Sequence, residues 1–129
     1  MGLEQNLGVG VDICDVSRIK SDIENLDTFV IDNFTDPEIV YCEQANNPQV
    51  RAQRYAARFA AKEAIIKALG GIDEAPDFRE IYILKGRSGR PFVHLEGRAK
   101  QQADAIGVSR IHLSLAHLKD LAIAYCAVS

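Results

Sequence analysis

Residues 58–70, with the sequence RFAAKEAIIKALG, combine side chains that suit a phosphate and a metal ion. Glu63 and Lys67 are four residues apart, so on a helix they share one face and present a carboxylate and an ammonium group to the same ligand. A metal-bound diphosphate needs both groups. The segment therefore predicts a helix that contacts phosphate and metal.

Asp12 is the second acid of interest, because Mg²⁺ is a hard cation that proteins commonly hold with one or two carboxylates while phosphates and water complete its octahedron. Two purely structural alternatives stay open at this point. A strand-end acid such as Asp12 often caps the next helix. Glu63 and Lys67 can form an i,i+4 salt bridge on a solvated face, which stabilises a helix by only about 0.3–0.5 kcal/mol.

A basic stripe precedes and overlaps this segment, on a helix that we expect over residues 50–69 and that Gly70 and Gly71 would end. Its members follow at i, i+3, i+7 and i+11: Arg51, Arg54, Arg58 and Lys62. The whole chain has a formal net charge of −3. A stripe of one sign on an acidic protein suggests an anionic partner, but a solvated helix face explains it equally well.

Two histidines, His112 and His117, bracket the sequence HLSLAH near the end of the chain. A histidine at a strand end or turn is more often structural than catalytic, although an imidazole can also donate to a phosphate or exchange a proton near neutral pH.

The segment 85–91, KGRSGRP, is typical of a glycine-containing hairpin loop. Its spacing does not match a Walker loop, and a nucleotide contact by Arg87 or Arg90 is the secondary interpretation.

Hydrophobic periodicity predicts the elements that must position these groups. In residues 8–13, valine or isoleucine alternates with glycine and Asp12, which is typical of a strand with one apolar and one nearly bare face. The bare face would let another backbone or a ligand approach closely. A helix follows this strand. A second, short helix should begin at the capping box of Thr35 and Glu38, with Pro37 in its first turn, and reach about Glu43. Further strands are expected over 79–84, 92–96, 111–116 and 121–128, with a short helix ending near residue 107 and a hairpin turn around 117–120.

Length and composition limit the class of protein. A chain of 129 residues, 47% hydrophobic and 26% charged, fits one globular domain, 1–129. Its three cysteines are widely separated and form no CxxC pair, so we expect free thiols in a reducing cytosol. No apolar run is long enough to span a bilayer, and the acidic charge argues against general nucleic-acid or membrane affinity. The sequence therefore predicts a soluble cytoplasmic protein.

Taken together, four segments resemble the holo-acyl-carrier-protein synthase type of 4'-phosphopantetheinyl transferase. They are GVGVDICDVSRI at 8–19, RFAAKEAIIKALG at 58–70, GRP at 89–91 and HLSLAHLKDLAIAYCAV at 112–128. The resemblance implies an α/β (α+β) fold in which an antiparallel sheet packs against a long helix and shorter helices. It also implies transfer of phosphopantetheine from coenzyme A to a serine of an apo acyl carrier protein, in fatty-acid or polyketide synthesis, with release of 3',5'-ADP.

The same resemblance implies the roles of individual residues. Asp12 and Glu63 would bind Mg²⁺ and, with Lys67, form the catalytic set. The base that takes the serine proton is either a metal-polarised water, which we favour, or Glu63 itself. Arg18 on the first helix would contact the acidic carrier protein. The residues expected to contact coenzyme A are Arg58, Lys62, Lys67, Gly70, Pro91 and His117.

Members of this type are typically trimers with active sites between subunits, so the resemblance implies a homotrimer. A module that binds coenzyme A through the basic helix but transfers nothing is the alternative from the binding class. An RNA-binding domain is a third alternative, but the chain lacks the aromatic stacking platform that such domains use.

Overall fold

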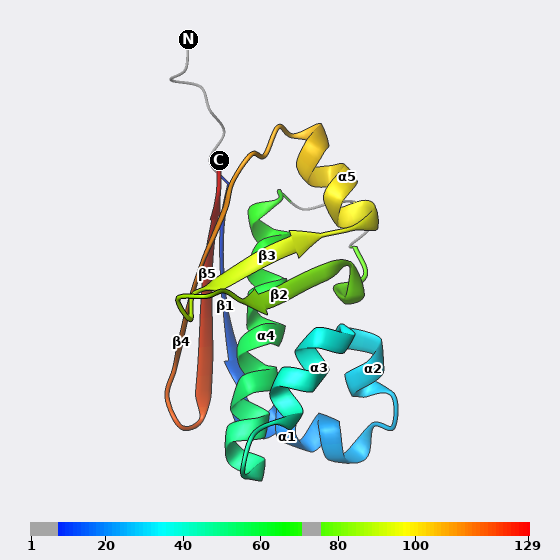
Figure 1. Ribbon diagram of the computed structural model, residues 1–129, viewed down its shortest axis with the longest axis vertical. Helices are drawn as coiled ribbons and strands as arrows, with labels where there is room; N and C mark the ends of the chain where they lie inside the picture. Colours follow the sequence, from blue (N-terminus) through cyan, green and yellow to red (C-terminus); the bar gives the residue numbers. More distant parts are fainter. Residues whose placement is uncertain (1–7, 71–75) are drawn as a thin grey trace.

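A 21-residue helix, α4 (Pro48–Ala68), runs through the middle of the structure and packs against a three-stranded antiparallel sheet (Figure 1). The computed structural model describes residues 8–70 and 76–129. The sheet has the strand order β1-β5-β4, from β1 (Gly8–Asp15), β5 (Leu121–Val128) and β4 (Ile111–His117). The remaining elements are α1 (Val16–Asn25), α2 (Phe29–Asn33), α3 (Asp36–Glu43), the 3-10 helix η2 (Phe78–Glu80), β2 (Ile81–Lys85), β3 (Pro91–Leu95) and α5 (Gly97–Ala105).

These elements confirm the expected fold class and nearly every expected segment. The capping box of Thr35 and Glu38 starts α3, and Gly70 ends α4 with a positive φ of 94°. The short helices α2 and η2 were not expected, and Gly71 lies outside the described residues. All three cysteines are free, as predicted, and the structure shows that they are also buried. Within the described segments, no helix combines the length and apolar character that crossing a bilayer requires.

Strand β1 lies directly on α4 because its inner face carries almost no side chain. A Cβ atom added at Gly8 would lie 1.9 Å from the carbonyl oxygen of Ala68, and one at Gly10 would lie 2.0 Å from that of Ala64. The expectation that the bare face admits another backbone is therefore confirmed. The close approach places Asp12, the next residue on this face, against the same helix.

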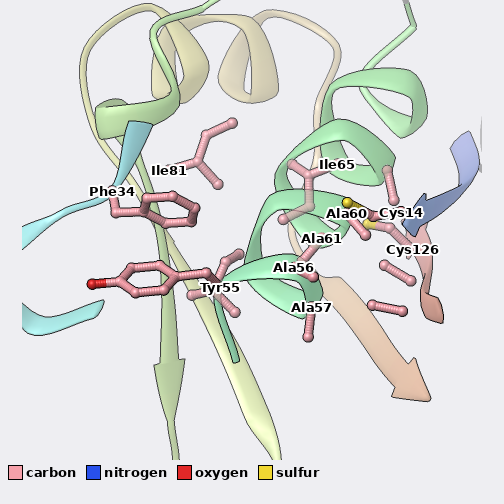
Figure 2. Close-up of a cluster of buried hydrophobic side chains, with 14 of the residues drawn as sticks. Cys14, Phe34, Tyr55, Ala56, Ala57, Ala60, Ala61, Ile65, Ile81 and Cys126 are labelled. Carbon is pink, nitrogen blue, oxygen red and sulfur yellow. The ribbon is translucent and has the colours of Figure 1, made fainter. Parts of the chain in front are cut away.

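The interior is built around the alanine-rich surface of α4 (Figure 2). Phe34, Tyr55 and Ile81 pack on one side of the helix, while Cys14 and Cys126 pack between the other side and the sheet (Figure 2). The buried alanines of α4 are Ala52, Ala56, Ala57, Ala60, Ala61, Ala64 and Ala68. Small side chains at these positions let both layers approach the helix, which fixes the orientation of its polar residues.

One ion pair is buried in this interior. Lys62 is 0% exposed, and its Nζ donates to Glu38 Oε1 at 2.6 Å, to the carbonyl oxygen of Asn33 at 2.8 Å and to that of Phe78 at 2.9 Å. Glu38 Oε2 in turn accepts the backbone N–H of Ile83 at 2.9 Å. The pair therefore joins α4 to α2, α3, η2 and β2. Burial lowers the pKa of Lys62, and the carboxylate of Glu38 opposes that effect.

Removing one charge of this pair should destabilise the protein strongly. Lys62→Met leaves Glu38 as an uncompensated buried carboxylate, so we expect the free energy of unfolding to fall by about 3–5 kcal/mol. The double variant Glu38→Gln/Lys62→Met removes both charges and should recover at least half of that loss. Urea denaturation measures all three values. Lys67→Met, at an exposed position, is the control, and a double variant less stable than Lys62→Met alone would contradict the analysis.

Candidate active site

Asp12 on β1 and Glu63 on α4 interact electrostatically across the contact between these two elements. Lys67 Nζ donates to Asp12 Oδ1 at 3.2 Å and to the carbonyl oxygen of Val11 at 3.0 Å. In the described part of the chain, Lys67 pairs with Asp12 and forms no salt bridge with Glu63, so the i,i+4 alternative does not describe this helix face. Asp12 also does not cap α1, because Asp15 accepts the N–H of Ser17 there. The structure thus brings the three residues predicted to be catalytic to one place.

The electrostatics of this group favour a bound cation. Partial burial raises the pKa of Glu63, and the nearby carboxylate of Asp12 raises it further. Lys67 and Arg18 act in the opposite direction on that pKa. Two carboxylates that repel each other in a partly buried place are stabilised by a divalent ion between them.

The donor set fits Mg²⁺ as the ion. Among the described residues, no group of three or more histidine, cysteine or acidic side chains is arranged to hold a metal. Mg²⁺ does not need such a group, because one or two carboxylates suffice when substrate phosphates and water supply the other oxygens. Asp12 and Glu63 match that requirement.

A second feature is a cavity of about 450 Å³ between the N-terminal half of α4, the β2–β3 hairpin and the end of β4. Three cationic side chains, Arg54, Arg58 and Lys85, line it together with the imidazole of His117. No acidic residue from the described ranges lines it. Pro91, also predicted to contact the coenzyme, lies in its wall. This cavity has the charge of an anion site.

His117 reaches the cavity because the β4–β5 turn is tied to α4. The carbonyl oxygen of Lys119 accepts the side-chain amides of Gln49 at 2.8 Å and Gln53 at 3.1 Å. The backbone N–H of Val16 donates to the carbonyl oxygen of Asp120 at 2.9 Å. His112 is exposed on β4 and is not part of this cavity.

Within one chain, α4 separates the carboxylate pair from the cationic cavity. Arg58 and Glu63 are five residues apart, so their side chains leave the helix roughly 140° apart around its axis. Asp12 and Leu115 lie in one row of the sheet, paired to the same residue of the central strand β5, and Leu115 lines the cavity. The two features are therefore on opposite flanks of α4.

Two residues predicted to bind coenzyme A are not brought to either feature. Lys62 is one of them: its ammonium group is fully buried and has Glu38 and two carbonyl oxygens as partners, so it is not part of the basic stripe that solvent can reach. Gly70 lies at the C-terminal end of α4, about 18 Å along the helix axis from Arg58. Its positive φ explains a glycine there without a ligand.

The remaining predicted residue, Arg18, is exposed on α1 beside the carboxylate pair. Its guanidinium lies 3.7 Å from Asp22 and 6.0 Å from the centre of the Phe59 ring.

Sequence reasoning missed two residues of the cavity, Tyr41 and Lys85. Tyr41 lies on α3, where the sequence signals only the helix start, and the hairpin that carries Lys85 can be recognised from its sequence but not its position against α4.

Comparison with known proteins assigns the family. Residues 8–126 match the family model of the 4'-phosphopantetheinyl transferase superfamily, and the chain belongs to this superfamily. Within it, the chain is similar to holo-[acyl-carrier-protein] synthases. It is 47% identical over 118 residues to the one from Clostridium kluyveri, which covers 92% of this chain and 86% of that protein.

Solved structures agree with this assignment. The holo-ACP-synthase from Plasmodium yoelii has a TM-score of 0.82 at 31% identity, covering 96% of this chain and 97% of that one. The Helicobacter pylori holo-[acyl-carrier-protein] synthase in complex with coenzyme A has a TM-score of 0.79 at 29% identity, covering 94% of this chain and 99% of that one. The resemblance seen in the sequence motifs is confirmed.

The pKa of Glu63 tests whether the two carboxylates interact. Asp12→Asn removes one cause of the raised pKa and frees Lys67 to act on Glu63, so both effects should lower that pKa in the metal-free protein. An NMR titration of the Glu63 side-chain carboxyl measures it. Asp15→Asn neutralises a nearby exposed acid that does not act on Glu63, and should leave the pKa unchanged. An unchanged pKa of Glu63 in Asp12→Asn would mean that the two carboxylates do not interact.

Proposed function

We propose that the chain transfers the 4'-phosphopantetheine group from coenzyme A to a serine hydroxyl of an apo acyl carrier protein and releases 3',5'-ADP. The observation that carries this proposal is the meeting of Asp12, Glu63 and Lys67 at the β1–α4 contact. The names of the relatives and a neighbour's complex with coenzyme A support the same reaction. Fatty-acid or polyketide synthesis in the cytoplasm is the setting that this acceptor implies.

The residues divide the work of this reaction. The serine oxygen forms a bond to the phosphorus that bears pantetheine, and the bond from that phosphorus to the 3',5'-ADP oxygen breaks. Asp12 and Glu63 would hold Mg²⁺, which supplies positive charge to the diphosphate and to the leaving oxygen. Lys67 orients Asp12 and adds a cation at the same place. The serine proton passes to a water molecule or to Glu63.

The cationic cavity is suited to the 3'-phosphate of coenzyme A. A phosphate monoester carries up to two negative charges, and guanidinium groups match its oxygens in geometry as well as charge. Arg58 and His117 line this cavity, together with Arg54 and Lys85. Arg18 would contact an acidic carrier protein as that protein delivers its serine, and its exposure and its electrostatic effect on Glu63 support this role.

A homotrimer with sites between subunits is part of this proposal. Val9, Val11 and Ile13 are 57%, 53% and 62% exposed, and Tyr125 of the adjoining strand is 48% exposed. An apolar sheet face of this kind usually marks an interface. In a closed ring, this contact would bring the carboxylate pair of one subunit to the cationic cavity of its neighbour, which α4 prevents within one chain.

The transfer reaction distinguishes this function from a coenzyme A-binding module. With Mg²⁺ and coenzyme A, we expect mass spectrometry to show one phosphopantetheinyl group added to an apo carrier protein. Asp12→Asn and Glu63→Gln should each lower kcat/KM at least about 100-fold, because each removes half of the metal site. Asp15→Asn is the charge-matched control. Coenzyme A binding without transfer to fatty-acid or polyketide carriers would support the module instead.

Mixing two defective variants tests the shared site. Asp12→Asn lacks one metal-binding carboxylate, and Arg58→Ala lacks the phosphate contact. A site built from an intact Asp12 and a neighbour's intact Arg58 is nevertheless complete. Trimers refolded from an equal mixture should therefore regain about one quarter of the native sites. Transfer is measured at low coenzyme A concentration, where Arg58→Ala alone is nearly inactive. Activity no higher than the average of the two variants would mean that each chain builds its own site.

A further inference from the structure

Tyr41 contacts both arginines of the cationic cavity. The guanidinium carbons of Arg54 and Arg58 lie 4.4 Å and 4.2 Å from the centre of its ring, and Lys85 Nζ lies 5.5 Å from it. Arg54 also donates to the backbone carbonyl oxygen of Tyr41 at 2.9 Å. Three cations from α4 and β2 therefore gather around one aromatic ring on α3.

This arrangement places like charges together, with no salt bridge to either arginine in the described part of the chain. Arg54 and Arg58 are four residues apart on α4, and neither forms a salt bridge with an acidic residue of segments 8–70 or 76–129. Like charges at this spacing repel each other. Arg51, at the start of the same stripe, lies 2.8 Å from Glu43 and shows the pairing that the other two lack.

In the described part of the chain, Arg58 has a buried N–H group that lacks a hydrogen-bond acceptor. The residue is only 7% exposed, and this buried group is its Nε. Its NH1 makes one long contact, 3.5 Å, to the carbonyl oxygen of Arg54. A buried N–H group without an acceptor is costly, and a ligand oxygen in the cavity would satisfy it.

We propose that Tyr41 is a positioning residue that holds Arg54 and Arg58 in place for the 3'-phosphate of coenzyme A, and so makes the cavity selective for that group. The negative face of the ring attracts both guanidinium groups and offsets their repulsion before any ligand arrives. Without the ring, the arginines separate and must be ordered again by the phosphate, which weakens binding. This inference rests on the proposed function.

Two nucleotides that differ only in the 3'-phosphate provide the test: 3',5'-ADP and 5'-AMP, titrated by calorimetry into the assembled protein. We expect the native chain to prefer 3',5'-ADP. Tyr41→Leu should weaken 3',5'-ADP binding about tenfold, the size expected from losing two partly desolvated cation–π contacts, while 5'-AMP binding stays the same. Tyr41→Phe keeps the ring and should remain within about twofold of the native value.

The transfer assay gives a second readout that a merely structural residue would not produce. Tyr41→Leu should raise KM for coenzyme A about tenfold with kcat unchanged, and should leave KM for 3'-dephospho-coenzyme A as it was. The role of Tyr41 would be overturned if Tyr41→Leu raised KM equally for both donors. It would also be overturned if the native chain preferred coenzyme A over 3'-dephospho-coenzyme A and Tyr41→Leu left both KM values unchanged. Because calorimetry needs no transfer, a native chain that discriminates between the nucleotides without transferring anything would contradict the proposed function alone.

Discussion

The contact of β1 with α4 through bare backbone is the constraint on which the rest of the structure depends. Gly8 and Gly10 leave no room for a Cβ atom against the carbonyl oxygens of Ala68 and Ala64. At this separation the side chain of Asp12 reaches across the contact to the helix that carries Glu63 and Lys67. A strand with ordinary side chains at these positions would lie farther away, and the two carboxylates would come from elements that no longer touch.

Charge is handled in two ways along the same helix. Lys62 is buried and fully paired, and its partners tie α4 to the neighbouring elements. Arg54 and Arg58 approach an aromatic ring and open cavity space without a carboxylate in the described segments, and Asp12 and Glu63 repel each other with Lys67 beside them. Charges that the protein leaves uncompensated cost stability and are kept where a ligand of opposite sign supplies the compensation.

The sequence predicted those parts of the fold and site that depend on local pattern. Alternation fixed the face of Asp12, the capping box fixed the start of α3, and the motifs around Glu63 identified the family. The burial of Lys62 was not predicted, because helical spacing gives the face of a residue but not what covers that face, and here α3 and η2 cover it. Tyr41 was missed for the same reason, since its contacts with α4 are tertiary.

The geometry of α4 also gives a physical reason for the proposed oligomer. A ligand that spans a diphosphate and a distant phosphate needs a metal site and an anion site facing one common space, but one helix with a sheet on one side presents Glu63 and Arg58 on different flanks. Moving one set to the other flank would disturb the alanine surface on which β1 packs. In the proposed trimer, joining two flanks from different copies would leave that packing intact, and the exposed apolar face of β1 would provide the surface for the contact.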